Sequence, residues 1–370
     1  MRVEKLSFLN FRNLDNCTIE PCGGVNMIYG RNAQGKTNIL EAIWLFCGGH
    51  SFRSSGIRDM INFEKSFSRL DCVFFGQDRE QTATINLASG KKTVTVNGVE
   101  KKTSSALIEK FCAVVFSPEN LSFIKRGPGE RRNFLDSALC REKLRNAVLL
   151  SNYNKLIAQR NALLKDIAVK PVLRDTIDIW DSQIIASGSR LIRERLEYVR
   201  MIGERAEIYH KGISRERESL SLRYISSVGA EYGDSLGEIE EKFAERFRKN
   251  RKNELACGVT LTGPHRDDID ILINNRSARQ FASQGQQRSA ILSLKLAEAG
   301  VLRDRMGEDP VILLDDVLSE LDSERQDFLL NELENCQVFI TCCEKSNKEQ
   351  LKSGRIFLVS SGKISREEAD

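Results

Sequence analysis

The fold is decided by the stretch Gly30-Arg31-Asn32-Ala33-Gln34-Gly35-Lys36-Thr37, which fits the pattern G-x-x-x-x-G-K-S/T of phosphate-binding loops. The apolar run Val25–Tyr29 before it predicts a buried strand. After it, Ile39, Ile43 and Phe46 recur at the spacing of one helix face. In this setting the glycines let backbone N–H groups surround phosphate oxygens, and the helix offers its positive end. A chance glycine-rich turn is the alternative, and the strand and helix on either side disfavour it.

Nucleotide binding is therefore the leading prediction for this loop. We expect the Lys36 ammonium to reach the β- and γ-phosphates and the Thr37 hydroxyl to ligate Mg²⁺. Asn38, the next residue, joins the eight residues of the loop in the set expected to contact the nucleotide.

Length and composition restrict the interpretation less. The 370 residues suffice for one large domain or two ordinary ones. A net charge of +4 neither demands nor excludes nucleic acid, so any basic surface must be local. No apolar stretch has membrane-spanning length, and the N-terminus lacks the apolar core of a signal peptide. The ten cysteines show no C-x-x-C spacing, which favours reduced thiols in a cytoplasmic protein over a metal or disulfide framework. Because no stretch could span a membrane, no membrane partner is expected.

The first third of the chain alternates like a series of strands, and the next part is helical. Strands are predicted at Val3–Phe8, Cys17–Ile19, Leu70–Phe75, Thr82–Leu87 and Ala113–Phe116, with a hairpin over Thr93–Val99 around Asn97-Gly98. Arg131–Arg217 and Glu238–Lys252 are charged and helix-prone. Their apolar repeat is not sustained over several heptads, so we expect a compact helical insertion and no long coiled coil.

Strand character is predicted to resume at Gly258–Leu261, with Ile269–Ile273 pairing to what precedes it. The domain prediction is an α/β head formed by residues 1–130 and 255–370, interrupted by a mainly helical lobe of residues 131–254. The short strand Leu220–Ile225 is left open to belong to the head.

A second strong pattern is Val311-Ile312-Leu313-Leu314 followed by Asp315-Asp316, a buried strand that delivers carboxylates to its end. Asp315 is expected to hold Mg²⁺ through water, opposite Thr37, and Asp316 to orient or deprotonate the attacking water. An ordinary buried strand with an acidic turn is the alternative, and the phosphate loop in the same chain disfavours it. Lys36 and Asp315 stand 279 residues apart, so a domain must be inserted between the two halves of the site.

The segment Ser283-Gln284-Gly285-Gln286-Gln287 precedes a predicted helix at Ala290–Leu302 and the acidic strand. It resembles the signature motif of ABC-type ATPases, in which the serine and the helix N-terminus meet the γ-phosphate bound by the other subunit. Ser283, Gly285 and Gln286 are therefore expected to contact nucleotide. The alternative is a helix capped by Ser283, because serine is a favoured N-cap.

Several blocks together resemble the RecF family of bacterial recombination mediators, which is related to the heads of SMC and Rad50 proteins. They are Asn10–Asn13, Gly30–Thr37, Pro118–Asn120 running on to Gly127–Asp136, Gly263–Asp268, Ser283–Arg288 and Leu314–Asp322. The resemblance covers essentially the whole chain. It implies an ABC-type P-loop ATPase head, α/β in class, with an inserted helical lobe.

The resemblance also implies a function. A member of this family is expected to be a weak DNA-dependent ATPase that forms a dimer when it binds ATP. It is also expected to bind gapped duplex DNA or junctions of single- and double-stranded DNA. It is expected to help RecO and RecR load RecA onto single-stranded DNA in repair, recombination, replication and the SOS response. Asp316 stands where most ABC ATPases carry glutamate, and Thr341 where many carry a switch histidine. Both departures favour slow hydrolysis. The Q-loop glutamine is not identifiable, although Glu119 lies in that part of the chain.

Two basic clusters are the candidate DNA contacts, because phosphate binding requires grouped cations. The first is Lys125-Arg126 with Arg131-Arg132, and the second contains Arg248, Lys249, Arg251 and Lys252. A solvated helix face is the alternative, and it is slightly favoured for the second cluster. For His265 and Arg266, a structural role in a turn and contact with nucleotide or DNA are equally compatible with the sequence.

Two rival functions are an SMC-like structural clamp and, less favoured, the ATPase subunit of a transporter. The absence of long heptads disfavours the clamp. The inserted lobe and the Ser-Gln-Gly-Gln-Gln form of the signature disfavour the transporter subunit.

Overall fold

The computed structural model describes the chain except residues 49–50, 54–55, 102, 118–122, 344–353 and 368–370. The chain divides into two compact units. Unit 1 contains residues 1–121 and 291–370, and unit 2 contains residues 122–290. Among the described residues, no helix is both long enough and apolar enough to cross a membrane.

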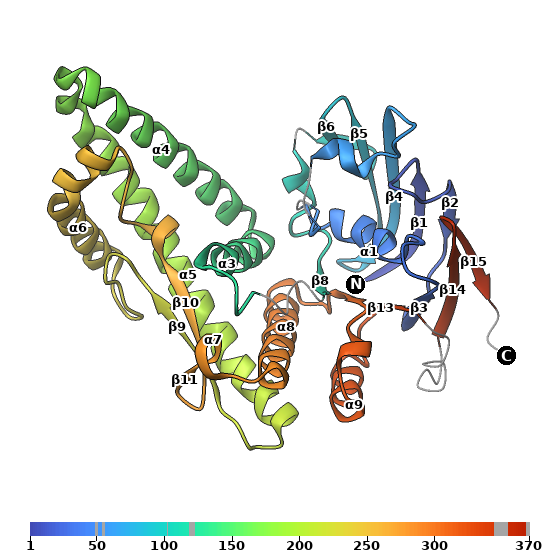
Figure 1. The fold of residues 1–370 in the computed structure, drawn as a ribbon. Helices are drawn as coiled ribbons and strands as arrows, with labels where there is room; N and C mark the ends of the chain where they lie inside the picture. The colour runs from blue at the N-terminus through green and yellow to red at the C-terminus, as the bar shows by residue number, and fades with distance from the viewer. Residues whose placement is uncertain (49–50, 54–55, 102, 118–122, 344–353, 368–370) are drawn as a thin grey trace. The chain divides into compact units, whose positions relative to one another are not determined.

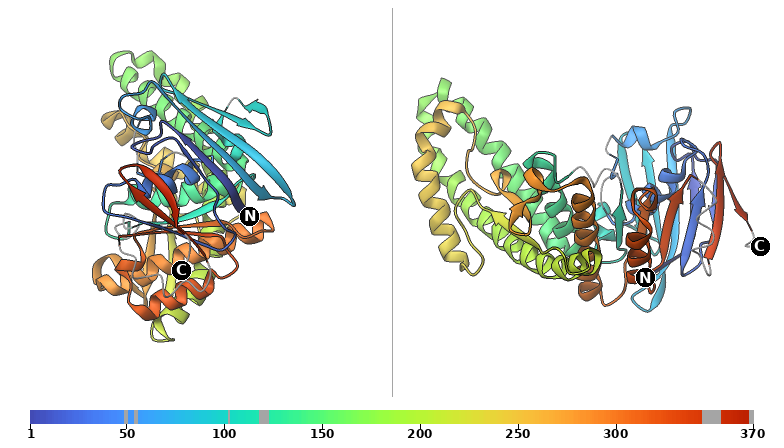
Figure 2. Two further views of the ribbon diagram at one scale, coloured as in Figure 1. Left: turned by 90° about the vertical axis from the view of Figure 1, so that its right-hand side faces the viewer. Right: turned by 60° about the horizontal axis from the view of Figure 1, so that its bottom comes forward.

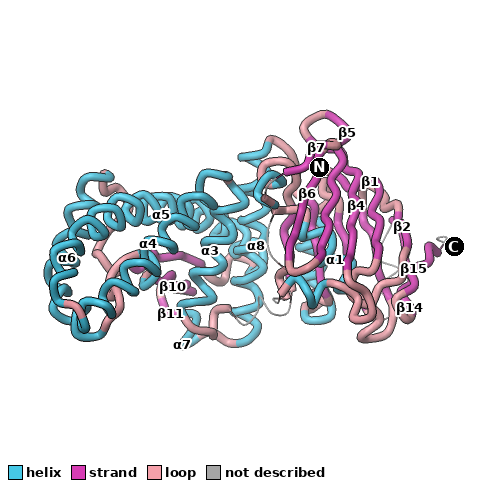
Figure 3. Tube along the Cα trace, turned by 90° about the horizontal axis from the view of Figure 1, so that it is seen from above, coloured by secondary structure: helices cyan, strands magenta, loops and turns pink. Residues whose placement is uncertain are grey.

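One sheet of unit 1 is antiparallel, with the strand order β2-β1-β4-β5-β6-β7. Figure 3 shows its strands side by side. They confirm the strands and the Asn97-Gly98 hairpin predicted from alternation. Their bounds are β1 Arg2–Leu9, β2 Cys17–Ile19, β4 Phe67–Gly76, β5 Arg79–Ala88, β6 Lys91–Val96 and β7 Val99–Lys101.

The second sheet of unit 1 has the order β15-β14-β3-β13-β12-β8, and its strands are parallel except for β15. Its strands come from both ends of the chain, and α9 (Ser323–Glu332) connects two of them. The strand bounds are β3 Val25–Tyr29, β8 Ala113–Phe116, β12 Val311–Asp315, β13 Val338–Cys342, β14 Gly354–Ser360 and β15 Lys363–Glu367.

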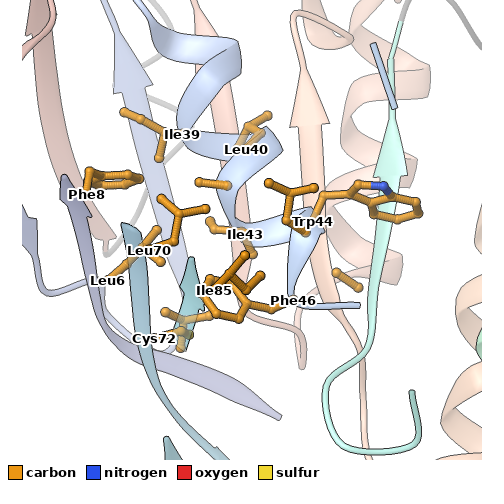
Figure 4. Close-up of a cluster of buried hydrophobic side chains, with 14 of the residues drawn as sticks. Leu6, Phe8, Ile39, Leu40, Ile43, Trp44, Phe46, Leu70, Cys72 and Ile85 are labelled. Atoms are coloured by element: carbon orange, nitrogen blue, oxygen red, sulfur yellow. The ribbon is translucent and has the colours of Figure 1, made fainter. Parts of the chain in front are cut away.

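Helix α1 (Lys36–Leu45) lies between the two sheets (Figure 1). Ile39 and Ile43 pack with Leu6 of β1 and Leu70 of β4 in one hydrophobic core (Figure 4). The helix also contacts β8, β12 and β13 of the parallel sheet. A helix enclosed on both sides must be largely apolar, and residues 39–45 are apolar apart from Glu41. The core therefore fixes the helix whose first residues are Lys36 and Thr37.

Unit 2 contains three long helices that pack on one another, seen from two further directions in Figure 2. A three-stranded sheet with the order β11-β10-β9 completes it. The bounds are α3 Pro128–Glu142, α4 Leu144–Val169, α5 Ile177–Ser214, β9 Leu220–Ile225, α6 Leu236–Cys257, β10 Asp268–Ile273, β11 Arg276–Ser277 and α7 Ala278–Phe281. Helix α8 (Gln284–Met306) begins in unit 2 and continues into unit 1.

The strand predicted at Gly258–Leu261 is wrong. Helix α6 continues to Cys257 and ends at Gly258, whose φ of 67° suits a helix C-cap. The next backbone N–H groups are bound by side chains and not by a neighbouring strand. Thr260 N–H donates to Asn161 Oδ1 (2.7 Å), and Leu261 N–H donates to a carboxylate oxygen of Glu254 (2.7 Å).

The bounds of the two units also differ from those expected. The first junction lies at residues 121–122, close to the predicted 130–131, but the second lies at 290–291 and not at 254–255. The reason is strand pairing, because β10 joins β9 along its whole length and holds residues 268–273 in unit 2. Leu220–Ile225 thus belongs to unit 2.

A fully buried arginine, Arg160 of α4, joins the three long helices of unit 2. Its guanidinium contacts Asp181 of α5 and Glu254 of α6, each at 2.7 Å. It also donates to the Thr260 hydroxyl (2.9 Å) and lies 4.5 Å from the ring centroid of Phe247. A buried cation needs this full set of partners, because desolvating its charge is costly.

We expect Arg160→Met to destabilise the protein by roughly 3–5 kcal/mol, because Glu254 would stay buried without its counter-charge. Arg145→Met is the matched control. Arg145 pairs with Glu194 at 3.1 Å, but its side chain is 66% exposed, so its loss should cost less than about 1 kcal/mol. Urea unfolding measures both changes, and equal losses would contradict the assigned role of Arg160.

Candidate nucleotide-binding site

The site is built at one edge of the parallel sheet. Strands β3, β13 and β12 are neighbours, and their register pairs Ile28 with Thr341 and Thr341 with Asp315. Because parallel strands end at the same edge, the loop after Tyr29 and the carboxylate of Asp315 are brought together across 278 residues of sequence.

The loop Gly30–Thr37 has the backbone that a phosphate-binding loop requires. Gly30 and Gly35 have φ values of 152° and 113°, and a Cβ on Gly30 would lie 2.2 Å from the carbonyl oxygen of Val359. Lys36 is buried, and its Nζ donates to the carbonyls of Gly30 (2.7 Å) and Arg31 (3.2 Å). The loop therefore surrounds its own lysine.

The other residues predicted in this loop lie in the expected turn. Arg31, Asn32 and Ala33 are exposed, and Gln34 is half-buried. Ala33 adopts the left-handed conformation with a φ of 64°. These four residues thus form the accessible rim of the loop.

Thr37 and Asp315 are in direct contact. The Thr37 hydroxyl donates to Asp315 Oδ1 at 2.8 Å, and the Thr341 hydroxyl donates to the same oxygen at 2.9 Å. Burial raises the pKa of the Asp315 carboxyl, while these two hydrogen bonds oppose the shift. A hydroxyl and a carboxylate are hard oxygen donors of the kind Mg²⁺ prefers. The residues present therefore fit a magnesium–nucleotide complex.

Asp316 follows in a left-handed conformation, with a φ of 52°. Its backbone N–H donates to the Thr341 hydroxyl oxygen at 2.9 Å, so Thr341 contacts both aspartates. Left-handed residues other than glycine are uncommon, and such outliers cluster at functional sites. The half-buried Asp316 thus stands in a fixed backbone at the edge that carries Lys36 and Thr37.

Two residues that support the loop were not among the predicted site residues. Asn13 donates to the Ala33 carbonyl (3.2 Å) and accepts from the Asn38 amide (2.6 Å), so it ties the loop to the first turn of α1. Arg53 donates to the Asn38 side chain (2.7 Å), and its charge favours the ionised form of Asp315. The block Asn10–Asn13 gave a signal for Asn13, whereas Arg53 lay in an unremarkable polar loop.

The signature-like segment starts α8. The Ser283 hydroxyl oxygen accepts from Gln286 N–H (3.2 Å), and the Gln286 side chain accepts from Ser283 N–H (2.8 Å). This reciprocal pair is a capping box. The N-cap alternative is therefore correct as local structure, and it is compatible with a phosphate contact because the Ser283 hydroxyl proton is not used in the cap. Gly285 lies in the first turn, and the helix begins six residues before the predicted Ala290.

The first basic cluster divides into exposed and buried members. Lys125 and Arg126 are exposed. Arg131 is buried, and its guanidinium makes two contacts of 2.7 Å with Asp268. Arg132 donates to the Asp267 carbonyl at 2.8 Å. Arg131 is therefore a structural residue and not an accessible phosphate contact.

The second cluster lies on α6. Arg248, Lys249 and Lys252 are exposed, as the solvated-face alternative requires. Lys249 pairs with Glu245, and Arg251 pairs with Asp178 and Asp181 of α5. Arg251 thus helps to join two helices of unit 2.

His265 and Arg266 have structural contacts in their turn. His265 lies 2.7 Å from the Tyr153 hydroxyl and 3.1 Å from the Thr260 carbonyl, to which Arg266 also donates. Because the carbonyl can only accept, His265 Nε2 carries the proton and Nδ1 accepts from Tyr153. Burial lowers the pKa of His265 to about 4, so the ring is neutral near pH 7. Glu119 lies outside the described residues.

Comparisons with known proteins agree with this geometry. The family model described as RecF/RecN/SMC N terminal domain matches residues 2–364. The DNA replication and repair protein RecF of Acetivibrio thermocellus is 39% identical and aligns over 96% of each chain. RecF of Clostridium botulinum is 39% identical over 99% of this chain and 100% of its own.

Solved structures of a RecF protein and of an Smc head domain also match this chain. A structure of the recombination mediator protein RecF with ATP, from the RecFOR pathway, is 36% identical with a TM-score of 0.93, and the alignment covers 99% of this chain and 97% of that chain. The Smc head domain of Pyrococcus furiosus shares the fold alone, at 16% identity and a TM-score of 0.55 over 99% of this chain and 96% of its own. These matches confirm the predicted ABC-type ATPase head. The chain belongs to the RecF family, within the broader group described as RecF/RecN/SMC N terminal domain.

Proposed function

We propose that this chain is an ATP-dependent DNA-binding protein of recombinational repair that acts in the cytoplasm. The observation that carries the proposal is the hydrogen bond between Thr37 and Asp315, which joins the phosphate loop to the acidic strand. Relatives with the name DNA replication and repair protein, and a RecF structure with ATP, support it. They favour repair over the transporter subunit considered from the sequence.

The residues of the site divide the chemistry of ATP hydrolysis among them. Lys36 interacts with the β- and γ-phosphates, and Thr37 with Asp315 holds Mg²⁺, which neutralises phosphate charge when bound. Asp316 orients or deprotonates the attacking water. Its short side chain suits slow hydrolysis. This hydrolysis is stimulated by DNA and releases the protein from it.

ATP binding is coupled to dimerisation in this proposal. Ser283, Gly285 and Gln286 of one copy contact the γ-phosphate held by Lys36 of the other copy. The N-terminus of α8 favours an anion there, because its N–H groups and dipole are positive. Each site is then complete only in the dimer.

The DNA bound is gapped duplex or a junction of single- and double-stranded DNA, and the partners are RecO and RecR, which load RecA. The name of the RecFOR pathway in the matched structures supports the partners. Lys125 and Arg126 are the candidate phosphate contacts favoured by their exposure. Arg248, Lys249 and Lys252 form a second candidate surface.

The whole proposal is tested by sedimentation with ATP, with ADP and with ATP plus gapped duplex, alongside ATPase rates with and without that DNA. We expect dimers with ATP only, a larger complex when DNA is added, and faster hydrolysis with DNA. A rate that ignores DNA would instead support a transporter-like subunit. An ATP-held dimer on DNA without hydrolysis would support the structural clamp.

Asp316→Asn should retain ATP binding and the ATP-dependent dimer, because Asp315 still serves the metal. Hydrolysis should fall about 10²-fold or more, the scale of general-base contributions. Single-turnover hydrolysis measures the loss, and Asp327→Asn on α9 is a control outside the site. Unchanged turnover would mean that another residue positions the water.

Mixing two inactive variants tests the composite site. Lys36→Ala should abolish ATP binding, because the charge on the β- and γ-phosphates is lost. Ser283→Arg should bind ATP as a monomer but neither dimerise nor hydrolyse. In a mixed dimer both defects fall in the same site and the other site is intact, so ATPase activity should return. If mixed dimers form and no activity returns, Ser283 does not act on the partner's nucleotide.

A further inference from the structure

The signature-like segment is held from outside by a residue that stands 68 positions earlier in the chain. Gln286 Nε2 donates to a carboxylate oxygen of Glu218 at 2.7 Å. Glu218 lies between α5 and β9, and it is outside every motif identified in the sequence. Both residues lie in unit 2.

The Gln286 side chain is fixed at both ends. Its amide oxygen accepts from Ser283 N–H at 2.8 Å, and its amide nitrogen donates to Glu218. The opposite amide orientation would set nitrogen against an N–H donor and oxygen against a carboxylate. Only one orientation satisfies both neighbours, so Glu218 selects the one that closes the capping box.

Glu218 is itself held in place. Its second carboxylate oxygen lies 3.2 Å from Nε2 of the buried His210. Arg215 and Glu216, both left-handed, turn the chain after α5. The Ser214 hydroxyl then accepts from Glu218 N–H at 3.3 Å. The Glu218 side chain is 21% exposed, and these polar contacts hold it in place.

We propose that Glu218 is a positioning residue for ATP-dependent dimerisation and hydrolysis. It fixes Gln286, and through the capping box it fixes the Ser283 hydroxyl and the first N–H groups of α8. This inference rests on the proposed contact of that segment with the partner copy's nucleotide. Glu218 itself does not touch the nucleotide.

The consequence of losing Glu218 follows from the cap. With Gln286 free to rotate, Ser283 N–H loses its fixed acceptor and the first turn of α8 loosens. A phosphate contact depends on placement within a fraction of an ångström. The phosphate loop of the same copy is in unit 1 and makes none of these contacts, so ATP binding by the monomer should not change.

Three variants separate positioning from general stability. Glu218→Ala should bind ATP like the wild type, while ATP-dependent dimerisation and hydrolysis fall about 10-fold or more. Glu218→Gln keeps an oxygen acceptor for Gln286 and should restore most activity. Glu207→Ala is the matched control, because Glu207 lies near the same end of α5 and pairs with Lys211 at the surface. It should behave as the wild type.

Mixing experiments give a readout that a merely structural defect would not produce. Glu218→Ala mixed with Lys36→Ala should regain ATPase activity, because one complete site forms. Glu218→Ala mixed with Ser283→Arg should not, because both copies lack a working signature segment. One contrary outcome is that mixing with Lys36→Ala restores activity to Ser283→Arg but not to Glu218→Ala. That outcome would reject the positioning role of Glu218 and leave the composite site in place. If neither is rescued, the composite site itself fails.

Hydrogen exchange tests the inference independently of ATPase activity. Backbone amides of residues 283–287 should exchange faster in Glu218→Ala than in Glu207→Ala, with Glu218→Gln close to the wild type. Equal exchange of this segment in all three variants would overturn the proposal.

Discussion

The structure depends on one constraint, which is that parallel strands end at a common edge. The hydroxyl of Thr37 can hold the carboxylate of Asp315 only because β3, β13 and β12 are parallel and adjacent. The sheet thus makes neighbours of residues from opposite ends of the chain. The same topology accommodates the insertion. The chain leaves the sheet after β8 and returns at β12, its immediate neighbour, so unit 2 interrupts no strand pair.

Unit 2 depends on a different principle, the pairing of buried charges. Arg195 of α5 is nearly fully buried, contacts Asp136 of α3 at 2.6 Å and donates to the Pro264 carbonyl. The carboxylate of Asp267 accepts from the Tyr224 hydroxyl (2.5 Å) and from Ser227 N–H (2.7 Å). These directional contacts require one particular arrangement of helices and strands, whereas apolar contacts tolerate many. Residues of the block Gly263–Asp268 therefore help to hold the helices and strands of unit 2 together.

Sequence reasoning succeeded where the information is local. Alternation predicted the strands, and the phosphate loop and Val311–Asp316 predicted the edge of the sheet at which Thr37 and Asp315 meet. It failed at Gly258–Leu261 and for Arg131, because a run of residues does not show that Asn161 or Asp268 will supply the hydrogen bond or the counter-charge. The second boundary of the insertion was missed for the same reason, since the partner of β10 lies more than 40 residues earlier.

The two departures from the broader ABC pattern are in contact with each other. Asp316 is one methylene shorter than the usual glutamate, and Thr341 stands where a switch histidine is common. The Thr341 hydroxyl accepts from Asp316 N–H while donating to Asp315. A hydroxyl can do both at one atom, whereas each imidazole nitrogen can do only one. Thr341 thus ties the backbone of the shorter catalytic candidate to the proposed metal ligand, and it helps to hold Asp316 in its left-handed conformation. The two departures are therefore coupled, because Thr341 on the neighbouring strand fixes the backbone at Asp316.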